Sequence, residues 1–180
     1  MLKKILIGLV IVVGAFAAYV AMQPSDYRIE RSATIDASPG QVFAQVNDFH
    51  NWQKWSPWAD LDPDARAEFQ GPDSGEGAKF SWDGNSEVGK GSMTVVGSKP
   101  DERIDIRLDF IEPMAGTSDV RFTFRPNGGK TDVTWAMSGQ AGFFEKAICM
   151  LFFDQDKIIG GMFEKGLKNL EAATRIAARQ

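Results

Sequence analysis

The sequence predicts an α+β fold: an antiparallel sheet of about seven strands covered by a long C-terminal helix, with one transmembrane helix in front. Three patterns lead to this prediction. Residues 5–22 are an uninterrupted apolar run. Between residues 27 and 137, several short segments alternate apolar with polar side chains, which is typical of strands with one wet face. Residues 143–175 carry apolar side chains at helical spacing.

The apolar run follows Lys3 and Lys4 and contains no charged, Asn or Gln side chain. As a helix, its length of roughly 27 Å would be close to the hydrocarbon thickness of a bilayer. A cleaved signal peptide is the alternative, because residues 15–17 read Ala-Phe-Ala, a small-x-small cleavage pattern. The apolar region of a signal peptide usually has only about 7–15 residues. We therefore expect an uncleaved anchor.

Charges around the run predict its orientation. Lys3, Lys4 and the terminal amine favour a cytoplasmic N-terminus, and Arg28 and Arg31 on the other flank partly offset them. We expect a single-pass membrane protein of the bacterial inner membrane with its domain on the periplasmic side. Residues 1–26 would be anchor and linker, and residues 27–178 one domain. A linker of about four residues reaches at most roughly 14 Å, which would keep the domain against the lipid headgroups.

Composition excludes several function classes. The formal charge is −4, and without Lys3 and Lys4 it is −6; no three basic residues are consecutive. Nucleic acid is therefore excluded as a partner. The single cysteine, Cys149, cannot form an intrachain disulfide. With His50 as the only histidine, most metal sites and catalytic triads are excluded, and we expect no cofactor and no metal.

The domain begins with a half-buried strand over residues 27–35, in which Arg31 breaks the alternation by standing on the apolar face. Ser38 and Pro39 then suit the N-cap and first position of a helix. The segment 50–73 is irregular and rich in tryptophan. Its Trp52, Trp55 and Trp58 have the spacing of one helical turn, which Pro57 keeps short.

After residue 74 the alternation defines a series of strands, and residues 103–110 have the clearest period of two. Gly128 and Gly129 mark a hairpin turn between two of these strands. The last helix is expected over residues 143–175. Gly160 and Gly161 should bend or loosen it midway, because each glycine costs roughly 1 kcal/mol relative to alanine in a helix.

This order of elements resembles the START-like helix-grip (SRPBCC) superfamily, and within it the polyketide cyclase/dehydrase and lipid-transport group. Four segments carry the resemblance: residues 35–43 (IDASPGQVF), 47–58 (NDFHNWQKWSPW), 123–135 (TFRPNGGKTDVTW) and 163–171 (FEKGLKNLE). The resemblance implies a curved sheet that grips the C-terminal helix, with an apolar cavity between them. The superfamily includes carriers, cyclases and hormone receptors.

Aromatic rings on the apolar face are the main candidates for lining such a cavity. The expected lining residues are Phe80, Trp82, Phe110, Phe122, Phe124, Trp135 and Phe152. Large rings around a cleft bind a hydrophobic ligand, but the same rings are also typical of a packed core. Trp55 and Trp58 are candidates for a rim or lid, with structural closure of one end, a partner surface or a membrane-interface belt as alternatives.

The resulting functional hypothesis is a membrane-anchored, non-catalytic domain that binds a lipid or another hydrophobic small molecule. A polyketide cyclase/dehydratase-like enzyme is the first alternative, and it would need His50, Asp83 or Glu112 to point into a deep cavity. A protein-interaction or stress-response domain is the second alternative, and it would need an exposed tryptophan patch at residues 52–58. The sequence favours a role without catalysis.

Overall fold

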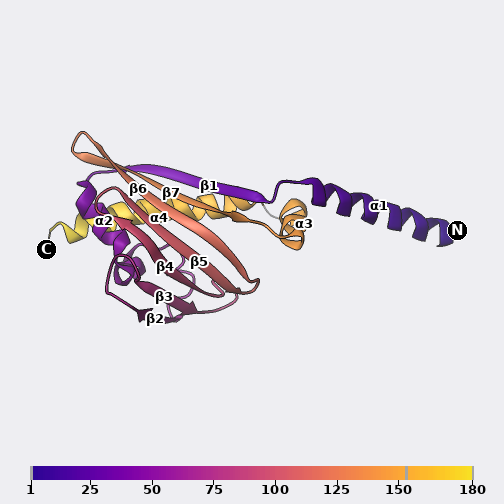
Figure 1. Cartoon of the computed structure of the whole chain (residues 1–180), viewed down its shortest axis with the longest axis horizontal. Coiled ribbons are helices and arrows are strands. Elements are labelled where there is room, and N and C mark those ends of the chain that lie inside the picture. Colours follow the sequence, from indigo (N-terminus) through magenta and orange to yellow (C-terminus); the bar gives the residue numbers. More distant parts are fainter. Residues whose placement is uncertain (1, 153, 180) are drawn as a thin grey trace.

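A computed structural model describes residues 2–152 and 154–179 of the chain (Figure 1). Within these residues, seven strands form one antiparallel sheet in the order β1-β7-β6-β5-β4-β3-β2. The sheet curves around a long C-terminal helix, and this confirms the predicted fold class. The strands are β1 (Asp26–Ile35), β2 (Arg66–Gln70), β3 (Lys79–Asp83), β4 (Lys90–Lys99), β5 (Arg103–Glu112), β6 (Gly116–Asn127) and β7 (Lys130–Gln140). The helices are α1 (Leu2–Met22), α2 (Pro39–Asn47), the 3-10 helix η1 (Phe49–Lys54), α3 (Phe143–Phe152) and α4 (Gln155–Ala177).

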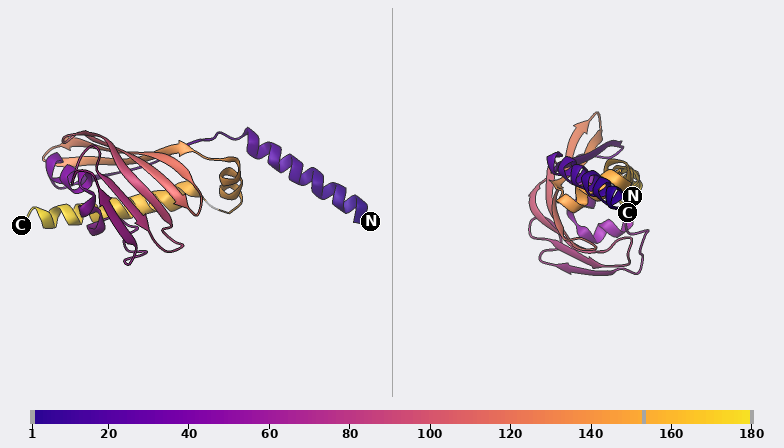
Figure 2. Two further views of the ribbon diagram at one scale, coloured as in Figure 1. Left: turned by 60° about the horizontal axis from the view of Figure 1, so that its bottom comes forward. Right: turned by 90° about the vertical axis from the view of Figure 1, so that its right-hand side faces the viewer.

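The alternation in the sequence corresponds to the two faces of this sheet. Inward side chains of β5, β6 and β7, such as Ile104, Phe122 and Val133, are fully buried. On the outer face, Asp105 accepts from Arg121 at 2.6 Å across the β5–β6 pair. The sheet therefore has a wet face, and α2, η1 and α4 cover the other (Figure 2).

The hairpin between β6 and β7 turns at Gly128 and Gly129, whose φ angles are 57° and 86°. Two successive positive φ angles are required by the type I′ turn that suits a two-residue hairpin, and glycine adopts them without strain.

The strand β2 was not predicted, because it falls in the segment interpreted as irregular. All five of its residues are exposed, so it has no buried face to produce an alternation.

The C-terminal region differs from the single bent helix expected over residues 143–175. The chain forms two helices, and the break lies between Phe152 and Gln155. Asp154 begins α4 as its N-cap, since its side chain accepts from the backbone N–H of Lys157 at 3.1 Å. Gly160 and Gly161 lie inside α4, which continues through them, whereas the interruption comes earlier, before Gln155.

α1 projects away from the domain at the end where α3 lies (Figure 1). It contacts α3, and Val20 in its last turn is buried, whereas most of its other side chains are exposed. Among the described residues, α1 is the one helix long and apolar enough to cross a membrane.

Candidate functional site

The space between the sheet and α4 is filled by aromatic rings centred on Trp135 of β7. Its indole stacks on Phe163 of α4, with ring centres 4.2 Å apart and planes 9° apart. Phe122 of β6 lies 4.8 Å from it on the sheet. Trp52, Trp55 and Trp58 complete the set at 5.7 to 6.3 Å. We call these six residues the aromatic layer.

Gly166 of α4 allows this close packing of helix on sheet. A Cβ at this position would lie 2.7 Å from Cζ3 of Trp135 and 3.1 Å from Cδ of Pro57. Any larger residue would push α4 away from the ring. The contact therefore positions α4 directly over Trp135.

Two of the indoles are fixed by the end of α2. Trp52 donates its Nε1–H to the carbonyl of Val46 at 2.8 Å, and Trp55 donates to the carbonyl of Gln45 at 3.1 Å. Helix ends leave carbonyls without intrahelical partners, and these side chains supply donors there. Trp52 and Trp55 are thus held in place by the backbone as well as by packing.

Trp135 has no such partner. Its Nε1–H is buried, the residue is 2% exposed, and no hydrogen-bond acceptor reaches it from the part of the chain that the structure describes. An indole N–H is a donor only, and when buried it usually finds a partner. A molecule that brought an acceptor into the aromatic layer would satisfy it.

The predicted cavity-lining residues separate into two groups. Phe122 and Trp135 meet in the aromatic layer, and Phe124 lies in the same core against Phe43, at 5.6 Å. Phe80 and Trp82 stack on one another at 6.0 Å further along the sheet. Phe110 lies at the edge of the second group, and the two rim candidates, Trp55 and Trp58, are members of the aromatic layer.

Phe110 is 36% exposed near the end of β5, edge-on to Trp82 at 6.5 Å. The side chain of Phe152 lies outside the described residues. Of the two expected rim residues, Trp55 is 1% exposed and belongs to the core. Trp58 is half-buried at the edge of the aromatic layer, against Trp135 and Phe163.

Two hollows lie at the surface, away from Trp135. The first, about 190 Å³, is bordered by His50, Phe69 and Lys79 among others. The second, about 350 Å³, lies between α2 and the end of α4, beside Gln45, Asn169 and Ile176. Gln45 also has a buried side-chain oxygen with no partner among the described residues.

The candidate acid and base groups lie outside the aromatic layer. His50 has a side chain that is 49% exposed; its Nδ1 lies 2.8 Å from Oδ1 of Asp48, and its ring stacks on Phe69 at 4.2 Å. The same Asp48 oxygen accepts from the backbone N–H of His50 and so begins η1. Asp83 pairs with Lys90 at 2.7 Å, and Glu112 is exposed at the end of β5.

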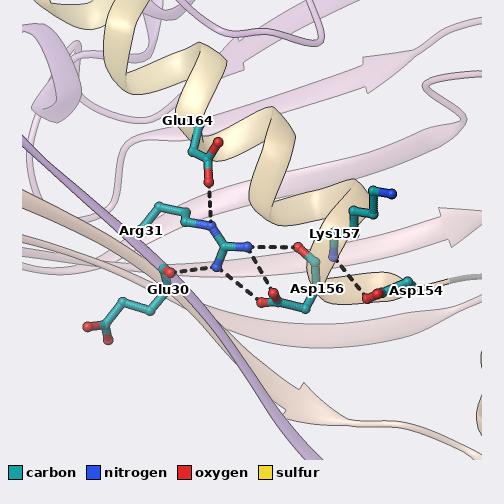
Figure 3. A network of polar contacts seen from close by, with 6 residues as sticks. All are labelled: Glu30, Arg31, Asp154, Asp156, Lys157 and Glu164. Atoms are coloured by element: carbon teal, nitrogen blue, oxygen red, sulfur yellow. Dashed lines mark hydrogen bonds and ion pairs between the residues drawn. The ribbon is translucent and has the colours of Figure 1, made fainter.

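Arg31, which the sequence analysis noted only as an exception to the alternation, joins β1 to α4. In the β1–β7 register it stands opposite Trp135, on the inner face. Its Nε donates to Glu164 at 2.8 Å and its Nη2 to Asp156 at 2.9 Å, and both carboxylates belong to α4 (Figure 3). These hydrogen bonds raise the pKa of Arg31, and Arg31 in turn lowers the pKa of Asp156. We call Arg31, Asp156 and Glu164 the Arg31 cluster.

The Arg31 cluster explains Gly160. A Cβ at this position would overlap Nη2 of Arg31, so the guanidinium can lie against α4 only where the helix has no side chain. The signal for the cluster was a basic residue on an apolar strand face, together with two glycines in a helix. Sequence alone did not connect the two.

Comparisons with known proteins agree with this architecture. A family model described as "Polyketide cyclase / dehydrase and lipid transport" matches residues 26–175. A search of the curated proteins found no match. Similar solved structures include protein CV1439 from Chromobacterium violaceum, with 18% identity, a TM-score of 0.58, and coverage of 84% of this chain and 98% of that one.

Two further structures extend the comparison. TTHA0849 from Thermus thermophilus has 16% identity and a TM-score of 0.57, covering 84% of this chain and 99% of that one. The di-domain ARO/CYC StfQ from the steffimycin biosynthetic pathway has 12% identity and a TM-score of 0.61, covering 86% of this chain and 53% of that one. At these identities the likeness concerns the fold.

Proposed function

The chain belongs to the polyketide cyclase/dehydrase and lipid transport family, and from this premise we propose that it is a membrane-anchored domain that binds a lipid or another hydrophobic small molecule without converting it. In this proposal residues 1–26 are the anchor and linker, and residues 27–178 are the binding domain. The bacterial inner membrane is the location, with the domain on the periplasmic side.

The observation that carries the proposal is the unpartnered Nε1–H of Trp135 inside an apolar layer, with no acceptor among the described residues. Leaving a buried donor unsatisfied costs about 1–3 kcal/mol. Ligand sites for small apolar molecules combine hydrophobic walls with a few polar groups that fix orientation. A carbonyl, ester or carboxyl oxygen on an otherwise apolar ligand would accept from Trp135 and recover this cost.

Entry to Trp135 requires some rings of the aromatic layer to separate. Trp58 is the half-buried member, and it lies in a segment of turns after η1, outside the helices and strands of the fold. Surface loops and turns open at lower free energy than core strands and helices. In this proposal the ligand displaces Trp58 and part of Phe163 from the ring of Trp135.

A binding role without catalysis is favoured by where the titratable groups lie. General acid–base chemistry needs a group within hydrogen-bond reach of the reacting atoms. His50 is half exposed and paired with Asp48, while Asp83 and Glu112 are at the surface. Arg31, the charged residue beside Trp135, is already matched by two carboxylates.

Native mass spectrometry of the full chain tests this proposal. The chain is extracted from membranes in detergent and released in the spectrometer, and retained hydrophobic molecules are identified. Residues 1–26 fused to an unrelated soluble protein serve as the control, because lipid that adheres to α1 then appears in both samples.

We expect about one additional hydrophobic molecule per full chain, and a lower occupancy in Trp135→Phe, which keeps the ring surface but loses the donor. Equal lipid content in the full chain and the control fusion would contradict ligand binding.

A further inference from the structure

α3 presents its apolar side chains outward, which is the reverse of an ordinary surface helix. Phe144 is 76% exposed, and Ile148 and Leu151, which share its face at helical spacing, are exposed as well. The charged residues of the same helix, Glu145 and Lys146, are half-buried. In α4, by contrast, Phe163, Leu167 and Leu170 point inward and are buried.

This orientation is fixed by contacts to the residues that follow α1. Lys146 donates from Nζ to the carbonyl of Gln23 at 3.0 Å, and the carbonyl of Ser25 accepts from the backbone N–H of Ala141 at 2.8 Å. Glu145 accepts from the backbone N–H of Gly142 at 3.3 Å, which satisfies a donor at the start of α3. The polar side of α3 therefore faces the linker, and its apolar side points away from the domain.

The position of α3 in the fold indicates what its exposed apolar side would contact. It is at the end of the domain from which α1 leaves, beside the last turn of α1 (Figures 1 and 2). Tyr19 and Met22 at that end of α1 are exposed too, and α1 contacts α3 there. A helix of ten residues is about 15 Å long, too short to cross a bilayer.

We propose that α3 is an interfacial helix whose apolar face, Phe144, Ile148 and Leu151, enters the headgroup region of the bilayer that α1 crosses. This inference rests on the membrane anchoring proposed above. Amphipathic helices of this kind bury their apolar face roughly 5–10 Å into the boundary between headgroups and acyl chains. The lipid surface is the occupant because α1 would bring it to within a few residues of α3, and Lys146 stands on the side away from the acyl chains.

The inference gives the domain a fixed orientation. α1 alone would allow the domain to rotate about the linker, whereas two contacts with the bilayer define which face meets it. The aromatic layer is joined to this face through α4, which begins directly after α3.

Depth-dependent fluorescence quenching of the full chain in liposomes tests the inference. In a Cys149→Ala background, single cysteines at Phe144 and Leu151 are labelled with an environment-sensitive dye, and the matched control carries the label at Lys130 in the distant β6–β7 hairpin. Lipids with a quencher near the headgroup end of the acyl chain are compared with lipids that carry it near the terminal methyl.

We expect strong quenching and a blue-shifted emission at positions 144 and 151, greater with the shallow quencher than with the deep one, and no change at position 130. Ile148→Glu should reduce the quenching at position 144 while the chain still floats with the liposomes. A chain that floats but is not quenched at 144 and 151 would overturn the docking of α3 and leave the anchoring intact. A chain that does not float would overturn the anchoring, and the docking with it.

Discussion

At the scale of single residues, Arg31 holds the start of α4 on the edge strand β1. Its side chain is 24% exposed and bonds two carboxylates of the helix. Arg31→Met keeps much of the side-chain length and removes these hydrogen bonds, so we expect a lower melting temperature. Arg28→Met is the matched control, because Arg28 lies on the same strand and pairs only with the exposed Glu30. Circular dichroism of the full chain in detergent measures both, and equal melting temperatures would contradict this role of Arg31.

The same cluster predicts a pH dependence. Arg31 lowers the pKa of Asp156 in the folded chain, chiefly through a hydrogen bond. A carboxyl whose folded pKa is lowered stabilises the fold above its unfolded pKa, about 3.9, and loses this contribution as the pH falls through the folded value. The difference in melting temperature between wild type and Arg31→Met should thus be constant from pH 7 to about 5 and shrink towards pH 3. A difference that grew on acidification would have the wrong sign.

Gly160 and Gly161 provide a matched pair of substitutions on one helix. Alanine in place of an exposed helical glycine usually stabilises by about 0.5–1 kcal/mol. Gly161→Ala should do so, because a Cβ there meets nothing within 4 Å. Gly160→Ala should stabilise less than Gly161→Ala or not at all, because its Cβ would displace the guanidinium of Arg31 from Asp156 and Glu164 and this loss offsets the gain in helix propensity. Chemical denaturation of both variants gives the two free energies of unfolding, and an equal gain in both would be inconsistent with the packing described.

At the scale of elements, the packing of η1 against the end of α2 depends on the hydrogen bond from Trp52 to the carbonyl of Val46. Trp52→Phe removes the donor to the carbonyl of Val46, whereas Trp135→Phe removes a donor that has no partner among the described residues. Both changes delete a similar buried surface. We expect Trp52→Phe to lower the free energy of unfolding by about 1–3 kcal/mol more than Trp135→Phe. Denaturant titration followed by circular dichroism compares them, and an equal loss would show that the Val46 carbonyl needs no donor.

Within the sheet, the strands with a buried face were the ones that the sequence predicted. The alternation in residues 103–110 and the Gly128-Gly129 turn correspond to β5 and the β6–β7 hairpin. β2 was missed because none of its side chains is buried. The break between α3 and α4 was not predicted, because helix propensity marks Gly160 and Gly161 as the weak point of this region, whereas close contact with Arg31 favours glycine at position 160.

The candidate site was harder to predict than the fold. Period-two patterns identify which aromatic residues face inward, but they do not distinguish Phe122, in the aromatic layer, from Phe110, at the surface. The orphaned N–H of Trp135 depends on where every nearby carbonyl of the described chain lies in space, so no local pattern contains it. Arg31 was visible as an exception, and its partners lie 125 and 133 residues away.

At the scale of the whole molecule, α4 connects the proposed membrane-contacting end of the domain with the proposed ligand-binding layer. α1 and α3 are at one end (Figure 1), the Arg31 cluster fixes the start of α4 (Figure 3), and Phe163 of the aromatic layer lies on the same helix, between Asp156 and Glu164. In the proposed function, the ligand that displaces Trp58 would come from the bilayer at which α1 and α3 hold the domain.

The charges that flank α1 predict on which side of the membrane the domain lies. Lys3 and Lys4 favour a cytoplasmic N-terminus, so alkaline phosphatase fused after Gln180 should be active in a Gram-negative host, and a green fluorescent protein fusion at the same site should be dark. Moving the two lysines to the other flank of α1 should reduce the phosphatase activity.

Intact mass measurement distinguishes a membrane anchor from a cleaved signal peptide. We expect the chain in washed membranes to retain residues 1–17, because α1 as a whole is long enough to span the bilayer. A soluble chain beginning after residue 17 would show that the apolar segment directs export and is then removed. In that case the apolar face of α3 would lose the lipid surface argued for it.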